Sequence, residues 1–133
     1  MFLGDRVKDQ YGAAAVFDEL ASSPAGMEAS KFCDAYGLLE GHKVECADGL
    51  QAYCQAPMGG TECWITVPRD EMCGAWRGKD MVVKLEKALY GHPLSGAYWE
   101  RHCNQAVGKC GFVPIGNCLN GQVASSTPSV AYI

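Results

Sequence analysis

Polar and apolar residues alternate in two short stretches, residues 43–47 and 61–67, and alternation of this kind is typical of β-strands. A run of apolar residues within 80–85 predicts a third strand. Apolar residues recur at helical spacing in two longer stretches, residues 25–39 and 94–110. The pattern therefore predicts two amphipathic helices and three strands.

This order of elements predicts an α+β fold in which the helices pack on a small, mostly antiparallel sheet. We expect strands 43–47 and 61–67 to be neighbours in that sheet. The Ala-rich segment 13–21 favours a further helix, Ser22 to Pro24 have the composition of a helix start, and residues 112–114 favour another strand or a buried turn.

Residues 117–133 are polar and Ser-rich and show no periodicity, so we expect them to be disordered. With no internal repeat and no linker in between, the rest of the chain reads as one domain. The predicted organisation is a domain over 1–116 followed by a divergent tail over 117–133.

The composition is that of a globular protein with 133 residues and a net charge of −4. A mildly acidic chain argues against strong nucleic-acid binding by this piece alone. The sequence shows neither a signal peptide nor a membrane-spanning run, so we expect no membrane partner and an intracellular, by default cytoplasmic, location, with the nucleus as an alternative.

Eight cysteines are present and none forms a CxxC pair. That spacing, together with the expected intracellular location, favours reduced thiols in the core over a disulfide set or a zinc site. A Cys–His nucleophile pair stays open as an alternative, because such pairs are formed in space rather than in sequence.

The first candidate for chemistry is Asp48, which ends the strand 43–47 and is followed by Gly49 and, five residues on, by Tyr53. A carboxylate with an aromatic ring one helical turn away suits a divalent cation and a flat substrate. The alternative is structural: Asp48 followed by Gln51 has the spacing of a helix cap, and most Asp residues at such junctions only cap.

Two longer strings carry a resemblance to a known family: SSPAGMEASKFCDAYGLLEGHKVECADGLQAYCQAP and VVKLEKALYGHPLSGAYWERHCNQAVGKCGF. In this order and at this separation, the chain from about residue 2 to 115 resembles the reverse transcriptase of copia-type long-terminal-repeat retrotransposons. The resemblance implies the fingers and the N-terminal part of the palm of a Pol polyprotein.

By this resemblance Asp48 matches one of the three carboxylates that hold two Mg²⁺ ions in the family. Two ions about 4 Å apart activate the primer 3′-hydroxyl and stabilise the leaving pyrophosphate in nucleotidyl transfer. The implied partners are a dNTP and an RNA or DNA template–primer.

The resemblance also implies nucleotide-binding residues. The backbone of Gly49 and Leu50 would lie beside the triphosphate of the incoming nucleotide. Tyr53 would pack under its sugar. Tyr90 and Gly91 would form a turn over the nucleotide and template.

The sequence departs from the family because it contains no Asp-Asp pair, whereas the family's Tyr-x-Asp-Asp hairpin supplies the other two carboxylates. We expect the chain to end before that hairpin, so that this piece alone is inactive as a polymerase. A palm sheet without its hairpin exposes an unpaired edge, which predicts self-association. The alternatives are a non-catalytic transposon-derived relic, a protein-interaction module, or a small thiol-dependent protein.

Overall fold

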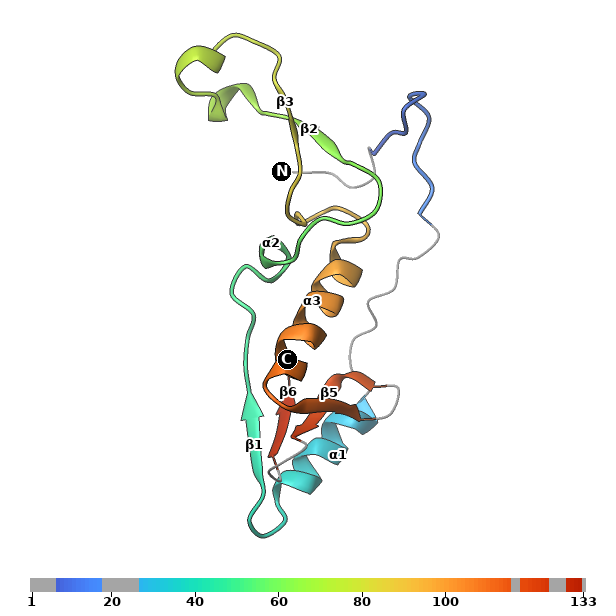
Figure 1. Ribbon diagram of the computed structural model, residues 1–133, viewed down its shortest axis with the longest axis vertical. Helices are drawn as coiled ribbons and strands as arrows, with labels where there is room; N and C mark the ends of the chain where they lie inside the picture. The colour runs from blue at the N-terminus through green and yellow to red at the C-terminus, as the bar shows by residue number, and fades with distance from the viewer. Residues whose placement is uncertain (1–6, 18–26, 116–117, 125–128, 133) are drawn as a thin grey trace.

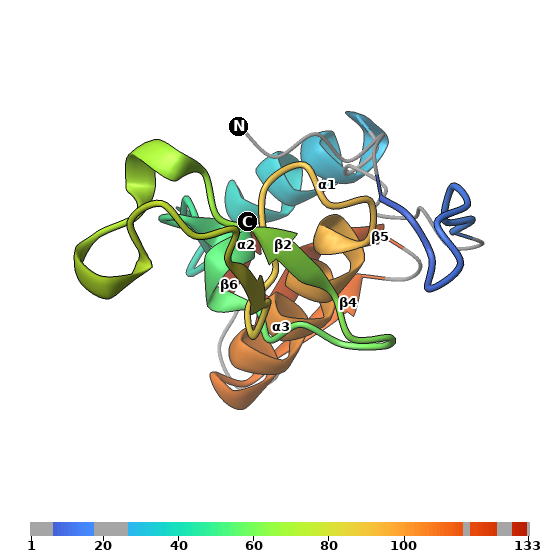
Figure 2. The same cartoon turned by 90° about the horizontal axis from the view of Figure 1, so that it is seen from above.

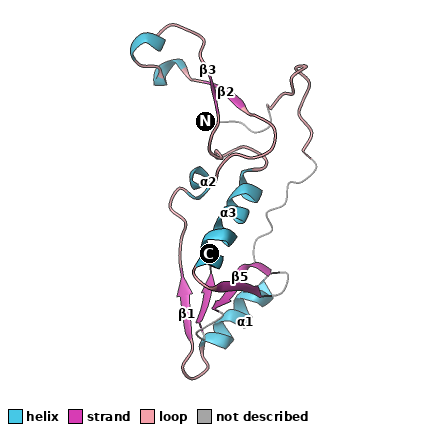
Figure 3. Cartoon of the chain, viewed as in Figure 1, coloured by secondary structure: helices cyan, strands magenta, loops and turns pink. Residues whose placement is uncertain are grey.

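The computed structural model describes residues 7–17, 27–115, 118–124 and 129–132. The molecule is elongated, and the helix α3 (Ser95–Lys109) lies between its two ends (Figure 1). One end contains a helix and a four-stranded sheet, and the other contains a two-stranded sheet and a loop that projects from it (Figure 3).

The four-stranded sheet has the order β1-β6-β5-β4. Its strands are β1 (Lys43–Cys46), β6 (Ser129–Tyr132), β5 (Cys118–Ala124) and β4 (Phe112–Ile115). The pairing of β1 with β6 is parallel, and the other two pairings are antiparallel. Both β1 and β4 are therefore edge strands of this sheet.

The helix α1 (Met27–Gly37) packs against β1, β5 and β6. Ala29 and Cys33, one turn apart, are its buried residues. The helix ends at Gly37, where a β-carbon would lie 1.8 Å from Cγ2 of Val44 in β1. Only a residue without a side chain lets α1 approach β1 this closely.

At the other end, β2 (Trp64–Thr66) and β3 (Val82–Lys84) form an antiparallel pair in which Ile65 lies opposite Val83. The loop between them contains two short 3₁₀ turns, η2 (Arg69–Glu71) and η3 (Gly74–Trp76). Seen from above, this loop and the N-terminal residues 7–17 project to opposite sides of the molecule (Figure 2).

The short helix α2 (Ala52–Gln55) packs against α3. The first residue of α3, Ser95, is fully buried, and its hydroxyl donates to the Leu89 carbonyl over 2.6 Å. Helix α3 ends at Lys109 with Cys110 as its C-cap, and the next residue, Gly111, has a φ of 87°. Glycine favours this left-handed conformation, which commonly ends a helix.

The structure confirms the helices predicted at 25–39 and 94–110 as α1 and α3. It confirms the strands predicted at 43–47, 61–67 and 80–85 as the shorter β1, β2 and β3. Residues 112–114, for which a strand or a buried turn was predicted, begin β4. Helices and small sheets together make an α+β fold.

The predicted pairing of strands 43–47 and 61–67 is wrong. Strand β1 pairs with β6, and β2 pairs with β3 at the opposite end of the molecule. The antiparallel partner of β2 is thus the next strand in sequence, whereas β1 pairs in parallel with a strand near the carboxyl end. Strand patterns alone do not specify which strands pair.

Two further expectations differ from the structure. Ala13 to Phe17 are not helical, because Lys8 and Ala14 form an antiparallel bridge that closes a turn; residues 18–26, with the predicted helix start, lie outside the described residues. The segment 117–133, expected to be disordered, contains β5 and β6, whose backbone groups bond to β4 and β1. The division into 1–116 and 117–133 stays a prediction.

Candidate functional site

The carboxylate of Asp48 is exposed on the extended connection between β1 and α2. The predicted helix cap is wrong: α2 begins at Ala52, its N-cap is Gln51, and no side chain caps it. Gln51 adopts a φ of 50°, so the chain makes a left-handed turn before the helix starts and Asp48 lies outside it. The structural role that competed with metal binding at Asp48 is thereby removed.

The turn after Asp48 lies against α3. A β-carbon on Gly49 would lie 2.8 Å from Cζ2 of Trp99, so glycine allows the connection to pass the indole ring. Leu50 is 80% exposed, and its carbonyl accepts a hydrogen bond of 2.6 Å from the Gln55 side chain. The backbone that the resemblance assigns to the triphosphate is thus held on a packed helix.

Two segments distant in sequence are joined just after α2. The Ala88 N–H donates to the Ala56 carbonyl and the Met58 N–H to the Glu86 carbonyl, each over 2.9 Å. Lys87 Nζ donates to the Gln55 carbonyl, also over 2.9 Å. Both alanines are buried, so their small side chains permit the close approach. This junction holds α2 beside the turn that contains Tyr90.

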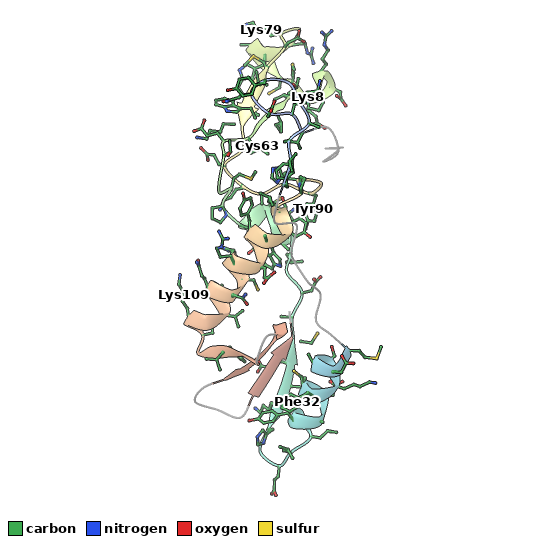
Figure 4. All side chains as sticks on the ribbon, turned by 90° about the vertical axis from the view of Figure 1, so that its right-hand side faces the viewer. Lys8, Phe32, Cys63, Lys79, Tyr90 and Lys109 are labelled. Carbon is green, nitrogen blue, oxygen red and sulfur yellow. The ribbon has the colours of Figure 1, made fainter. Side chains whose placement is uncertain are left out.

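The junction brings two predicted nucleotide-binding residues into contact. The rings of Tyr53 and Tyr90 have centroids 4.7 Å apart and planes inclined at 35°. Tyr90 lies at the amino end of α3 (Figure 4). Its side chain is 51% exposed, and Tyr53 is half-buried. Gly91 follows with a φ of 93°, which few other residues adopt. The pair presents a partly exposed aromatic surface.

A two-metal centre does not fit the described residues. Among them, no three His, Cys, Asp or Glu side chains are placed to hold a metal ion. Asp48 is a suitable oxygen donor for Mg²⁺, which proteins often bind through one or two carboxylates plus substrate phosphates. Within the described part of the chain, Asp48 is thus a single exposed carboxylate and not part of a preformed metal site.

Seven of the eight cysteines form no disulfide: Cys33, Cys46, Cys54, Cys63, Cys73, Cys103 and Cys110. Cys33 is buried in α1, and burial raises the pKa of the Cys63 and Cys103 thiols. A raised pKa leaves less thiolate at neutral pH, which argues against Cys63 and Cys103 as nucleophiles. The raised pKa of these two thiols therefore weakens the alternative that the chain is a small thiol-dependent protein.

Three residues that hold the turn containing Tyr90 in place were not predicted from the sequence to have this role. Ser95 bonds to Leu89, the Tyr98 hydroxyl donates to the Gly59 carbonyl over 2.7 Å, and buried His92 accepts from the Leu94 N–H over 3.2 Å. A polar residue on the buried side of a predicted helix, such as Ser95, was the available signal, since buried polar groups require partners.

Comparison with protein-family models, with curated proteins and with solved structures finds no match for the chain. Within the described ranges, no helix has both the length and the apolar character needed to cross a membrane.

Proposed function

We propose that this chain is a nucleotide-binding segment derived from the fingers and N-terminal palm of a copia-type reverse transcriptase. The observation that carries the proposal is the contact between Tyr53 and Tyr90. The resemblance assigned both residues to one nucleotide site, although they come from separate strings of the sequence. Their rings meet in the structure, which supports the assignment.

The proposed ligand is a Mg²⁺–dNTP complex, bound in the family by an enzyme that also holds an RNA or DNA template–primer. Tyr53 packs under the sugar, the backbone at Gly49 and Leu50 passes the phosphates, and Tyr90 with Gly91 covers the nucleotide. The exposed carboxylate of Asp48 contacts the Mg²⁺ that the phosphates carry. An intracellular location, cytoplasmic or nuclear, belongs to the same proposal.

The proposal does not extend to polymerisation by this chain alone. Two-metal transfer needs two cations fixed about 4 Å apart. The sequence contains no Asp-Asp pair to complete the carboxylate set around Asp48. We therefore expect nucleotide binding without primer extension.

The test is a titration of the chain with dNTP in the presence of Mg²⁺ and in the presence of EDTA. Binding is expected to be Mg²⁺-dependent and to lose that dependence in Asp48→Asn. The matched control is Asp70→Asn, which removes an exposed carboxylate in η2 far along the chain. Equal binding with and without Mg²⁺, or equal loss in both variants, would contradict the proposal.

Exposed apolar side chains favour a second candidate function, that of a protein-interaction module, over the other non-catalytic alternative of a transposon-derived relic. In and just after α1, Leu38 is 87% exposed, Leu39 53% and Phe32 51%. The edge strand β1 lies beside them, with Val44 42% exposed. Unpaired edges with apolar neighbours promote association, here between copies of the chain. Sedimentation of the wild type and of Val44→Lys tests this, since a charge on the edge should shift a dimer to monomer.

A further inference from the structure

A large cavity lies away from the tyrosine pair. Its volume is about 1030 Å³, and its walls come from residues 7–17, from the segment 58–64 and from the first turns of α3. Neither Asp48 nor Tyr53 nor Tyr90 lines it. Figure 4 shows Lys8 and Cys63, two lining residues, on the side of Tyr90 away from the four-stranded sheet. The cavity is thus separate from the proposed nucleotide site.

Aromatic rings make up part of the wall. Phe17 meets His92 edge to face with centroids 5.6 Å apart, and His92 stacks on Tyr98 at 6.4 Å. The hydroxyl of Tyr98 is fixed on the Gly59 carbonyl, and Trp64 lines the cavity from β2. Rings held in this way offer flat apolar surface at a low entropic cost.

His92 belongs to this apolar surface. Burial lowers its pKa, so the imidazole is neutral at neutral pH. Its Nδ1 accepts from the Leu94 N–H, which places the proton of the neutral ring on Nε2. The ring therefore adds no positive charge to the cavity.

The cavity is lined by two carboxylates, Asp9 and Glu62, that already have hydrogen-bond partners, and by two cations. Glu62 bonds to Lys84, which lowers the pKa of the Glu62 carboxyl. One carboxylate oxygen of Asp9 accepts from two backbone N–H groups of its own turn, at 2.9 Å each. Lys8 and Arg101 line the cavity, and within the described residues neither forms an ion pair.

We infer that this cavity binds a small aromatic monoacid. The planar body lies among Phe17, His92, Tyr98 and Trp64, and the acid group pairs with Lys8 and Arg101. Arginine binds a carboxylate through two parallel N–H groups, which fixes the orientation of such a ligand. The cavity is at the upper end of the volume that ligand pockets have, so a two-ring acid fits within it.

The probe is 1-naphthoate, titrated into the ¹⁵N-labelled chain and followed by amide chemical shifts. Saturable shifts are expected at residues 7–17 and 60–64, with none at Tyr53 and Tyr90. Naphthalene-1-carboxamide, which has the same rings and no charge, should bind about fivefold more weakly, as expected for the loss of a solvent-exposed ion pair.

Three variants test the roles of the walls. Arg101→Gln should weaken 1-naphthoate about fivefold. Lys109→Gln, a cation at the far end of the same helix (Figure 4), should leave binding unchanged. Ala97→Phe, which places a ring in the cavity from α3, should abolish binding.

Equal affinity for naphthoate and the carboxamide, equal effects of the two cation variants, or no saturable shift at 7–17 and 60–64 would each overturn the inference. The nucleotide titration has Asp48 as its sensitive residue, whereas this one has Arg101. Failure of either proposal therefore leaves the other standing.

Discussion

Around the amino end of α3, polar side chains bond to backbone carbonyls. At the other end of the molecule, α1 lies against a sheet whose strands come from distant parts of the sequence. We call the first the tyrosine region (residues 52–59 and 86–99) and the second the sheet region (α1 and β1, β4, β5 and β6). Ser95, Tyr98 and Lys87 provide the side-chain bonds of the tyrosine region. In the sheet region the strand pairings form the framework.

This difference bears on the proposed nucleotide site. Tyr53 and Tyr90 both belong to the tyrosine region, and the junction of Ala56 with Ala88 holds them together. None of these contacts involves β5 or β6. The sheet region, in contrast, needs β6 because β1 has no other strand partner in the described part of the chain. The two regions should therefore respond separately to change.

The largest effect is expected from a chain that ends at residue 115 and lacks β5 and β6. Strand β1 then loses its partner and α1 loses most of the sheet beneath it. Amide hydrogen exchange should show complete loss of protection over residues 27–46, while residues 95–105 stay protected. Uniform loss along the chain would mean that the regions form one cooperative unit.

Gly37→Ala should have the next largest effect, a loss of about 3 kcal/mol in the free energy of unfolding. The new methyl group would overlap Val44, whose β-branched side chain turns with difficulty. Urea unfolding measures the change. Gly108→Ala in α3 is the control: apart from its two neighbours and the backbone of its own helix, no atom lies within 4 Å of its β-carbon position, so alanine should stabilise by up to about 1 kcal/mol.

The comparison also explains how much of the structure could be predicted from sequence. Helical spacing was enough for α1 and α3, because each buries one face along its length. The strand that pairs with β1 could not be predicted from the sequence, because it consists of residues 129–132, a segment without a clear strand pattern. Parallel pairing between distant strands leaves no local signal in either strand.

For the candidate site, the two tyrosines were predicted from family resemblance, and only the structure shows their contact. The cap assigned to Asp48 failed because Gln51 takes a left-handed conformation, which is uncommon for residues other than glycine. The cavity was not predicted at all. Its walls combine residues 7–17 with β2 and α3, and no spacing rule links segments so far apart.

Ser95→Ala should cost about 2 kcal/mol of unfolding free energy, because the Leu89 carbonyl loses a buried hydrogen bond. The same variant should weaken dNTP binding, since Leu89 precedes Tyr90. Thr61→Ala, at an exposed hydroxyl outside the tyrosine region, is the control and should change stability by less than about 0.5 kcal/mol. Unchanged stability in Ser95→Ala would show that the hydroxyl does not fix this turn.

The smallest effect is a pH dependence carried by His92. Burial lowers its pKa in the folded chain, so below about pH 6.5 the unfolded chain binds a proton that the folded chain does not. The free energy of unfolding should therefore fall as the pH falls from about 6.5 towards the folded pKa. The slope is at most about 1.4 kcal/mol per pH unit, the value for one full proton.

Urea unfolding between about pH 5.5 and 7.5 measures this slope, in a window above the ordinary range of carboxyl groups. The slope should shrink in His92→Gln, which removes the titrating ring from beside Phe17 and Tyr98. His42→Gln is the control variant: it removes a histidine beside the sheet region, where the ring contacts Tyr36. If His92→Gln keeps the wild-type slope of unfolding free energy against pH and His42→Gln loses it, the pH dependence comes from the sheet region and its assignment to His92 is wrong.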